Sequence, residues 1–138
     1  MNEQAKKATE LFLGGLYCSQ AVLGAFCEKY ELDASLANRI SFGLNSGCRC
    51  ADVCGAVSGA LLVVGLKYGD NRSIGNKSIE EYIRIFKEKY GSIICRDLLG
   101  CDISTPDGNE QAIAKNLYKT RCVEIVASSA EILAGLDF

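Results

Sequence analysis

The chain of 138 residues has no histidine, no tryptophan and a single proline, Pro106. Without histidine it cannot build, from its own residues, a mixed Cys/His zinc site, a Cys–His dyad, a Ser–His–Asp triad or a histidine-ligated haem. It also lacks any Cys-x-x-Cys, which excludes a thioredoxin-type motif and covalent haem attachment through Cys-x-x-Cys-His. A single proline leaves room for long, uninterrupted helices.

Long apolar runs and a strong charge of one sign are missing as well. The longest apolar stretch, residues 53–66, is shorter than the roughly 20 residues that span a bilayer, so we expect no membrane insertion. The net charge of −2 argues against nucleic-acid binding, which needs a basic face. No apolar run precedes Leu11, which is not the pattern of a secretory signal, and we expect a cytoplasmic protein.

Helical periodicity runs through most of the chain, and no stretch alternates long enough to indicate a sheet. The sequence predicts an all-α, compact bundle of about five to six helices that forms a single domain over residues 1–138. The predicted helices cover residues 3–13, 17–30, 34–43, 53–69, 79–90 and 111–133, with a short one at 93–99. Residues 43–52 are predicted as a loop and 70–77 as a polar turn.

Two local signals refine these boundaries. Asp33 is a candidate N-cap for the helix over 34–43, in which we expect Leu36 and Ile40 to face the core. Ser78 and Glu81 match a capping box at the start of the helix over 79–90.

Cysteine is the residue in excess, with eight copies. In a reducing compartment, so many cysteines more often indicate metal, cluster or redox chemistry than disulfides. Cys18, Cys54 and Cys95 fall in the first turn of predicted helices, where free amides favour an anion and lower a thiol pKa. Cys122 is predicted in the middle of the last helix, in its buried stripe. Cys27 lies nine residues beyond Cys18, on the opposite helix face.

Small residues follow Cys54. Gly55 and Gly59 are four residues apart and share one side of the predicted helix, so another helix or a bulky inorganic group could approach the backbone closely. Both glycines are candidate cofactor-binding residues, although for Gly59 tight helix packing without a ligand is the favoured interpretation. For Gly55, which is next to the thiol, a place in the site is favoured.

A simpler interpretation competes with the thiol site. Any one of the eight cysteines is as consistent with a small buried hydrophobe as with a ligand, and Cys27 more so. The helix-start placement that three of them share favours a common site for four: Cys18, Cys54, Cys95 and Cys122. The run Cys48-Arg49-Cys50 is either a dithiol, a source of extra ligands or a mobile surface loop.

These residues match a known pattern. The chain resembles the family of redox-active proteins named for a Cys…Cys-Gly-Ala-x-x-Gly…Cys…Cys pattern, and the resemblance covers nearly its whole length. Residues 54–59 carry the central motif, and 15–22, 95–100 and the segment after Cys122 are similar to the other three cysteine segments. The resemblance implies a small all-α redox protein and no particular substrate. Cys27, Cys48, Cys50 and Cys101 are additions to the four-cysteine pattern.

A related domain occurs in split-Soret cytochromes, where it is associated with an iron–sulfur centre. The present chain lacks the haem motif, so the resemblance could extend to the cluster alone.

Three hypotheses follow. In the first, Cys18, Cys54, Cys95 and Cys122 hold one inorganic centre for electron transfer, an iron–sulfur cluster or, as a structural variant, zinc. In the second, a metal-free thiol–disulfide protein uses Cys54 as its reactive thiolate, with Cys18 or a loop cysteine as the resolving partner. In the third, Cys48 and Cys50 make the chain a soft-metal carrier.

Cys48, Cys50 and Cys101 are candidate extra ligands under the first hypothesis. The sequence identifies neither a substrate nor the redox partner. It leaves open whether the protein is an enzyme and whether two chains form a homodimer.

Overall fold

The computed structural model describes all residues 1–138, and short connections join its helices. It has eight α-helices rather than the five to six predicted. In chain order they are α1 (Glu3–Leu13), α2 (Cys18–Cys27), α3 (Ala34–Ser41), α4 (Gly55–Tyr68), α5 (Arg72–Tyr90), α6 (Cys95–Leu99), α7 (Pro106–Ala114) and α8 (Arg121–Gly135). Single turns η1 (Glu28–Tyr30), η2 (Phe42–Leu44), η3 (Gly47–Ala51) and η4 (Leu117–Lys119) stand between them.

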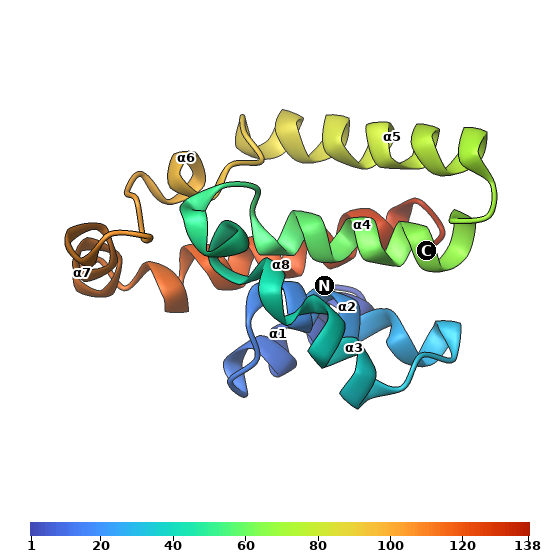
Figure 1. The fold of residues 1–138 in the computed structure, drawn as a ribbon, viewed down its shortest axis with the longest axis horizontal. Coiled ribbons are helices and arrows are strands. Elements are labelled where there is room, and N and C mark those ends of the chain that lie inside the picture. The colour runs from blue at the N-terminus through green and yellow to red at the C-terminus, as the bar shows by residue number, and fades with distance from the viewer.

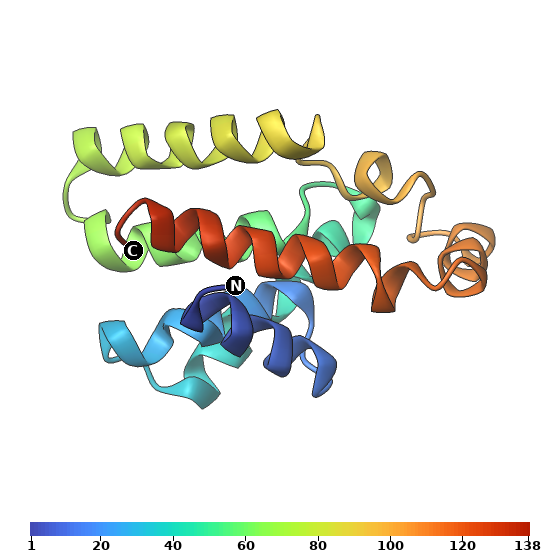
Figure 2. The same ribbon diagram turned by 180° about the vertical axis from the view of Figure 1, so that it is seen from behind.

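The helices form three layers (Figure 1). α4 and α8 lie in the middle, α1, α2 and α3 cover one side, and the long α5 covers the other. Seen from behind, α8 runs across the whole bundle, from the end where α6 and α7 lie (Figure 2). α4 begins at that same end. None of the helices combines the length and the apolar character that crossing a lipid bilayer requires.

The main core fills the space between these layers. Its largest fully buried side chains include Phe26, Tyr82 and Phe86. The buried Tyr82 hydroxyl is 2.7 Å from Ser129 Oγ, which donates to the Ala56 carbonyl oxygen at 2.8 Å. This chain of hydrogen bonds joins α5, α8 and the first turn of α4, and it satisfies polar groups that would be costly to bury alone.

Local signals place several helix ends correctly. α1 covers the predicted residues 3–13, and Asp33 caps α3 by accepting a hydrogen bond from the Leu36 backbone N–H at 2.9 Å. The start of α5 was predicted wrongly. The helix begins at Arg72, well before the predicted cap at Ser78, because the Asn71 side chain accepts a hydrogen bond from the Ile74 backbone N–H at 3.1 Å.

The inward face of α3 also differs from the prediction. Leu36 and Ile40 are 40% and 53% exposed, and Ala37 and Ser41 are buried instead. α2 approaches this face closely, since Ser19 Oγ donates to the Ser41 carbonyl oxygen at 2.9 Å. Small residues permit that approach, and larger apolar side chains would prevent it.

The predicted helix over 111–133 is two helices. α7 ends at Ala114, and Asn116 adopts a left-handed conformation with φ of 57°, which asparagine tolerates better than most residues. The turn η4 follows, and α8 begins at Arg121. The break leaves Cys122 in the first turn of a helix, not in the middle of one.

Candidate functional site

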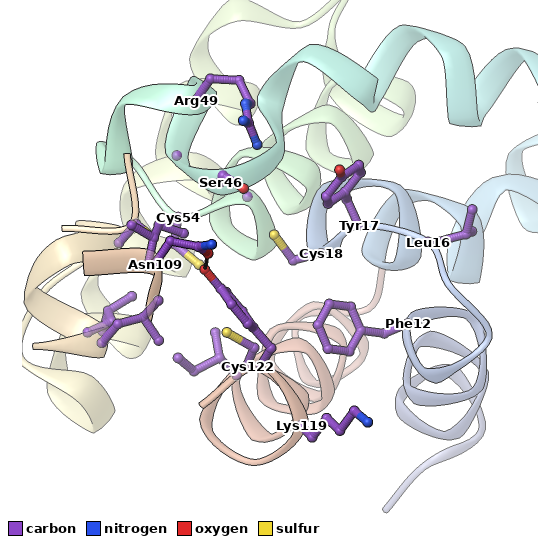
Figure 3. Close-up of a pocket in the computed structure, with 18 of the residues that line it drawn as sticks. Phe12, Leu16, Tyr17, Cys18, Ser46, Arg49, Cys54, Asn109, Lys119 and Cys122 are labelled. Carbon is purple, nitrogen blue, oxygen red and sulfur yellow. Dashed lines mark hydrogen bonds between the residues drawn. The ribbon is translucent and has the colours of Figure 1, made fainter. Parts of the chain in front are cut away.

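A cavity of about 450 Å³ opens at the end of the bundle where α6 and α7 lie. All four cysteines of the predicted set line it: Cys18, Cys54, Cys95 and Cys122. In Figure 3 the sulfur atoms of Cys18 and Cys122 face the same space from different helices. We call this space the cysteine cavity. Its volume lies within the range of roughly 300–1,000 Å³ that is typical of ligand pockets.

Each of the four cysteines stands at the start of a helix. Cys18 is the first residue of α2, Cys54 caps α4, Cys95 is the first residue of α6, and Cys122 is the second residue of α8. The sequence predicted this placement for three of them and wrongly for Cys122. Because a helix start carries partial positive charge, the four helix ends together favour negative charge in the cavity.

A single β-bridge brings two of these helix starts together. Val53 and Ile94 pair as an isolated antiparallel bridge. Beside it, the Cys54 backbone N–H donates to the Ile93 carbonyl oxygen and the Cys95 backbone N–H donates to the Asp52 carbonyl oxygen, both at 2.7 Å. The bridge therefore holds α4 and α6 with their first turns side by side. A bridge of one residue pair leaves no alternating pattern, so periodicity could not reveal it.

Gly55 makes room for a thiol. A Cβ atom at this position would overlap Cys18 Sγ and would lie 3.2 Å from the Leu44 carbonyl oxygen. Any larger residue would displace the sulfur from the place where it lines the cavity. The sequence placed Gly55 in the site because it is next to Cys54; in the structure it lines the cavity and also lies against Cys18 Sγ.

Gly59 serves helix packing instead. A Cβ atom here would come within 2.7 Å of the Ser19 carbonyl oxygen in the backbone of α2. No thiol is among its close neighbours, and it is not part of the cavity lining. The favoured interpretation from the sequence, tight packing without a ligand, agrees with this contact.

Burial controls the acidity of the four thiols. It raises the pKa of Cys18, and it raises that of Cys54 well above the usual value of a thiol. Burial, with further contributions from the neighbouring thiols, raises the pKa of Cys95 and Cys122 to about 12. Hydrogen bonding by the Ala56 backbone lowers the pKa of both Cys18 and Cys54, but by less than burial raises it.

The sequence led us to expect lowered pKa values at these helix starts, and for the metal-free molecule this is wrong. The helix ends are where they were expected, yet the loss of water around the sulfur atoms outweighs them. At neutral pH the four thiols are therefore protonated and poorly nucleophilic.

The remaining four cysteines lie outside the cavity lining. Cys48 and Cys50 are exposed on η3. Cys101 is buried in a small cluster that also contains Cys95. Cys27 belongs to the main core, and its thiol donates to the Gly24 carbonyl oxygen at 3.2 Å. Cys48, Cys50 and Cys101, predicted as candidate extra ligands, are thus not on the cavity wall.

The charged and polar groups of the cavity were not singled out from the sequence. Arg49 and Lys119 are its only charged lining residues, and no carboxylate lines it. The Tyr118 hydroxyl donates to Asn109 Oδ1 at 2.6 Å, and both residues line the cavity. Burial and the neighbouring thiols raise the pKa of Tyr118. Tyr118 is four residues before Cys122 and so falls in the same predicted buried stripe, which was the only signal in the sequence.

The spacing of the ligands bears on what the cavity could hold. No three cysteine, aspartate or glutamate side chains are gathered closely enough to hold one metal ion. A single tetrahedral zinc ion would need its four sulfurs within about 4 Å of one another, given Zn–S bonds of about 2.3 Å. In a four-iron cluster each iron takes one thiolate, so such a cluster suits sulfurs spread around a cavity wall.

Comparison with known proteins gives one match. The sequence model of a family described as "Putative redox-active protein (C_GCAxxG_C_C)" matches residues 16–136. The family's printed name puts glycine before cysteine, whereas residues 54–59 of this chain read Cys-Gly-Ala-Val-Ser-Gly. No curated protein and no solved structure matches the chain.

Proposed function

We propose, for a chain that belongs to the C_GCAxxG_C_C family of redox-active proteins, that the cysteine cavity holds an iron–sulfur centre and that the protein transfers electrons. The observation that carries this proposal is the convergence of four cysteines, from four separate helices, on one cavity without a carboxylate. Four thiolates are the usual ligand set of such clusters. A cytoplasmic location and a redox partner are part of the same proposal.

The charges around the cavity support it. A cluster with four thiolate ligands carries net negative charge, and burying that charge requires compensation. The starts of α2, α4 and α8 and the side chains of Arg49 and Lys119 supply positive charge on the cavity wall. The same groups lower the cost of adding an electron.

The thiol pKa values are compatible with ligation and unfavourable to free thiolates. Ligand binding requires each thiol to lose its proton, and a metal drives this even where the free thiol is a weak acid. When bound, the centre would accept and donate single electrons. Apolar lining residues such as Leu98 and Ile125 would keep water from the thiolates, and Gly55 would leave Cys18 Sγ free to ligate.

Anaerobic purification tests the proposal. The protein should contain iron and acid-labile sulfide, absorb in the visible range and give an EPR signal in one oxidation state. Serine in place of any one of Cys18, Cys54, Cys95 or Cys122 should lower the iron content. Cys27→Ser is the matched control, since a hydroxyl can keep the hydrogen bond to Gly24 and residue 27 is outside the cavity lining. Wild-type protein that stays colourless and iron-free after reconstitution would contradict the proposal.

A second candidate is thiol–disulfide chemistry between Cys54 and Cys18. The observation in its favour is that Cys18 Sγ lies against Gly55, the residue next to Cys54. It requires Cys54 to alkylate first in metal-free protein. Burial and the raised pKa of Cys54 favour the opposite order, in which the exposed Cys48 and Cys50 react first. Mass spectrometry after brief treatment with iodoacetamide shows which cysteines are alkylated first and so distinguishes the two orders.

A soft-metal carrier that uses Cys48 and Cys50 is the third candidate, and their exposure is compatible with it. The double replacement Cys48→Ser/Cys50→Ser should then lower the metal stoichiometry. Under the cluster proposal it should leave the iron content unchanged.

A further inference from the structure

The turn η3 has an unusual backbone. Four residues in or beside it that are not glycine adopt positive φ: Ser46 at 53°, Cys48 at 58°, Arg49 at 62° and Ala51 at 54°. Each such residue costs on the order of 1 kcal/mol or more, and such strain is concentrated at binding and catalytic sites. A strained turn of this kind persists only where its surroundings hold it.

Specific contacts hold η3 in place. A Cβ atom at Gly47 would overlap the Asp52 backbone nitrogen, so the turn closes tightly on the bridge before α4. Arg96 Nη1 donates to the Ala51 carbonyl oxygen at 3.1 Å. The turn is thus attached to both α4 and α6, whose starts line the cavity, and it places the exposed Arg49 at the cavity lining.

Arg49 has no acidic partner. Its only hydrogen bond is a long one, from Nη1 to Asn45 Oδ1 at 3.4 Å, and it takes part in no salt bridge. Figure 3 shows the guanidinium group extending toward the cavity, on the side of Cys18. Burial and the neighbouring thiols raise the pKa of Tyr118, and the positive charge of Arg49 acts weakly in the opposite direction. A guanidinium without a partner is suited to bind two oxygens of an anion.

The rest of the wall is mostly apolar. Phe12, Leu13 and Leu16 line one side, and Leu99 and Ile103 line another. Lys119 adds a second positive charge at the lining. A guanidinium beside an apolar wall fits a ligand that has one anionic group and a short hydrocarbon body.

We propose that the cysteine cavity binds a small organic anion, a short-chain carboxylate, with its carboxylate group on Arg49 and its hydrocarbon part against the apolar wall. The inference rests on the proposed function in one respect, since it places the anion beside the redox centre. Its binding contacts are made by residues other than the four cysteines.

Calorimetric titration of the anaerobically purified protein tests this directly. The probes are acetate, butanoate and hexanoate, with butanamide and hexanamide as neutral counterparts. Affinity should rise roughly fourfold for each added methylene that is buried. The carboxylates should bind at least about tenfold more tightly than the amides, and added salt should weaken the carboxylates only. Equal binding of acids and amides, or no binding of either, would overturn the proposal.

Substitutions of Arg49 test whether this residue binds the carboxylate group. Arg49→Gln should weaken hexanoate binding about tenfold or more, and Arg49→Lys should restore part of it. Arg72→Gln is the matched control, because Arg72 is exposed at the start of α5, beyond the far end of α4. Hexanoate binding by Arg49→Gln that equals the wild type would contradict the proposal.

Iron and sulfide analysis of the same samples separates this proposal from the previous one. Arg49→Gln should keep its iron while it loses the anion, which leaves the cluster proposal intact, and its reduction potential should fall because a positive charge beside the centre is gone. If Arg49 serves only to neutralise the cluster, the variant should lose iron, or shift in potential alone, while hexanoate binds as tightly as it does to the wild type. That outcome would overturn the anion site alone.

Discussion

The two ends of the bundle are built in different ways. The main core joins 23 buried residues, most of them from α1, α2, α4, α5 and α8, whereas the cluster behind the cysteine cavity has only five. The large core follows helical periodicity. The cavity end instead depends on a one-residue bridge, a left-handed turn and helix starts that meet from distant parts of the chain. The main core stabilises the fold. The cavity end holds reactive groups on a backbone that includes strained, positive-φ residues, which lower stability.

The largest predicted effect is on the free energy of unfolding at high pH, where the thiols of the cavity end should lower it. The cavity thiols Cys95 and Cys122 have pKa values of about 12, against about 8.5 in an unfolded chain. Their raised values stabilise the fold below about pH 8.5, and this stability is lost as pH rises toward 12, because the unfolded state releases its thiol protons first. Each thiol should contribute a slope of up to about 1.4 kcal/mol per pH unit.

Urea unfolding of the reduced, metal-free protein from about pH 8 to pH 11 measures this slope between the unfolded and folded pKa values. The double variant Cys95→Ala/Cys122→Ala should show a clearly flatter dependence than the wild type. Parallel curves for the two proteins would mean that these thiols are not the groups that burial perturbs.

Leucine truncation compares the two ends directly. Leu23 is fully buried in the main core, and Leu23→Ala should lower the free energy of unfolding by about 3 kcal/mol or more. Leu99 lines the cavity in the small cluster, so Leu99→Ala enlarges an existing space and should cost about 1–2 kcal/mol. Denaturant titration gives both values. A cost at Leu99 equal to that at Leu23 would remove the distinction between the two ends.

The main-core end could be predicted from the sequence in most respects. The all-α class, the span of α1 and the Asp33 cap follow from periodicity and capping chemistry, which are local. The inward face of α3 was predicted wrongly because the close approach of α2 selects small residues there, and one helix considered alone cannot show its neighbour.

At the cavity end, the sequence indicated which residues matter but not how they meet. Cysteine type and helix-start placement pointed to Cys18, Cys54 and Cys95. The pKa direction was wrong, because burial is a property of the assembled end and not of one helix. Arg49 was seen only as the residue between two cysteines, since its direction depends on a turn whose φ values no composition rule predicts.

Two glycines of α4 test how closely the layers pack. Gly59→Ala should lower the free energy of unfolding by about 2 kcal/mol, because its Cβ would press on the Ser19 carbonyl oxygen in the backbone of α2. Gly65→Ala is the control in the same helix. No atom lies within 4 Å of the place of its Cβ, so it should raise stability by about 0.5–1 kcal/mol. Thermal unfolding would contradict the packing argument if both changes stabilised the protein.

The smallest effect concerns the start of α5, where two capping signals compete. Asn71 caps the helix in the structure, so Asn71→Ala should lower the free energy of unfolding by about 1 kcal/mol. Ser78, the cap that the sequence favoured, lies inside the helix, and Ser78→Ala should change stability by less than about 0.5 kcal/mol, in the stabilising direction. Circular dichroism during urea unfolding measures both. A larger loss at Ser78 than at Asn71 would put the start of α5 at residue 79 and would show that its first two turns do not contribute to the core end.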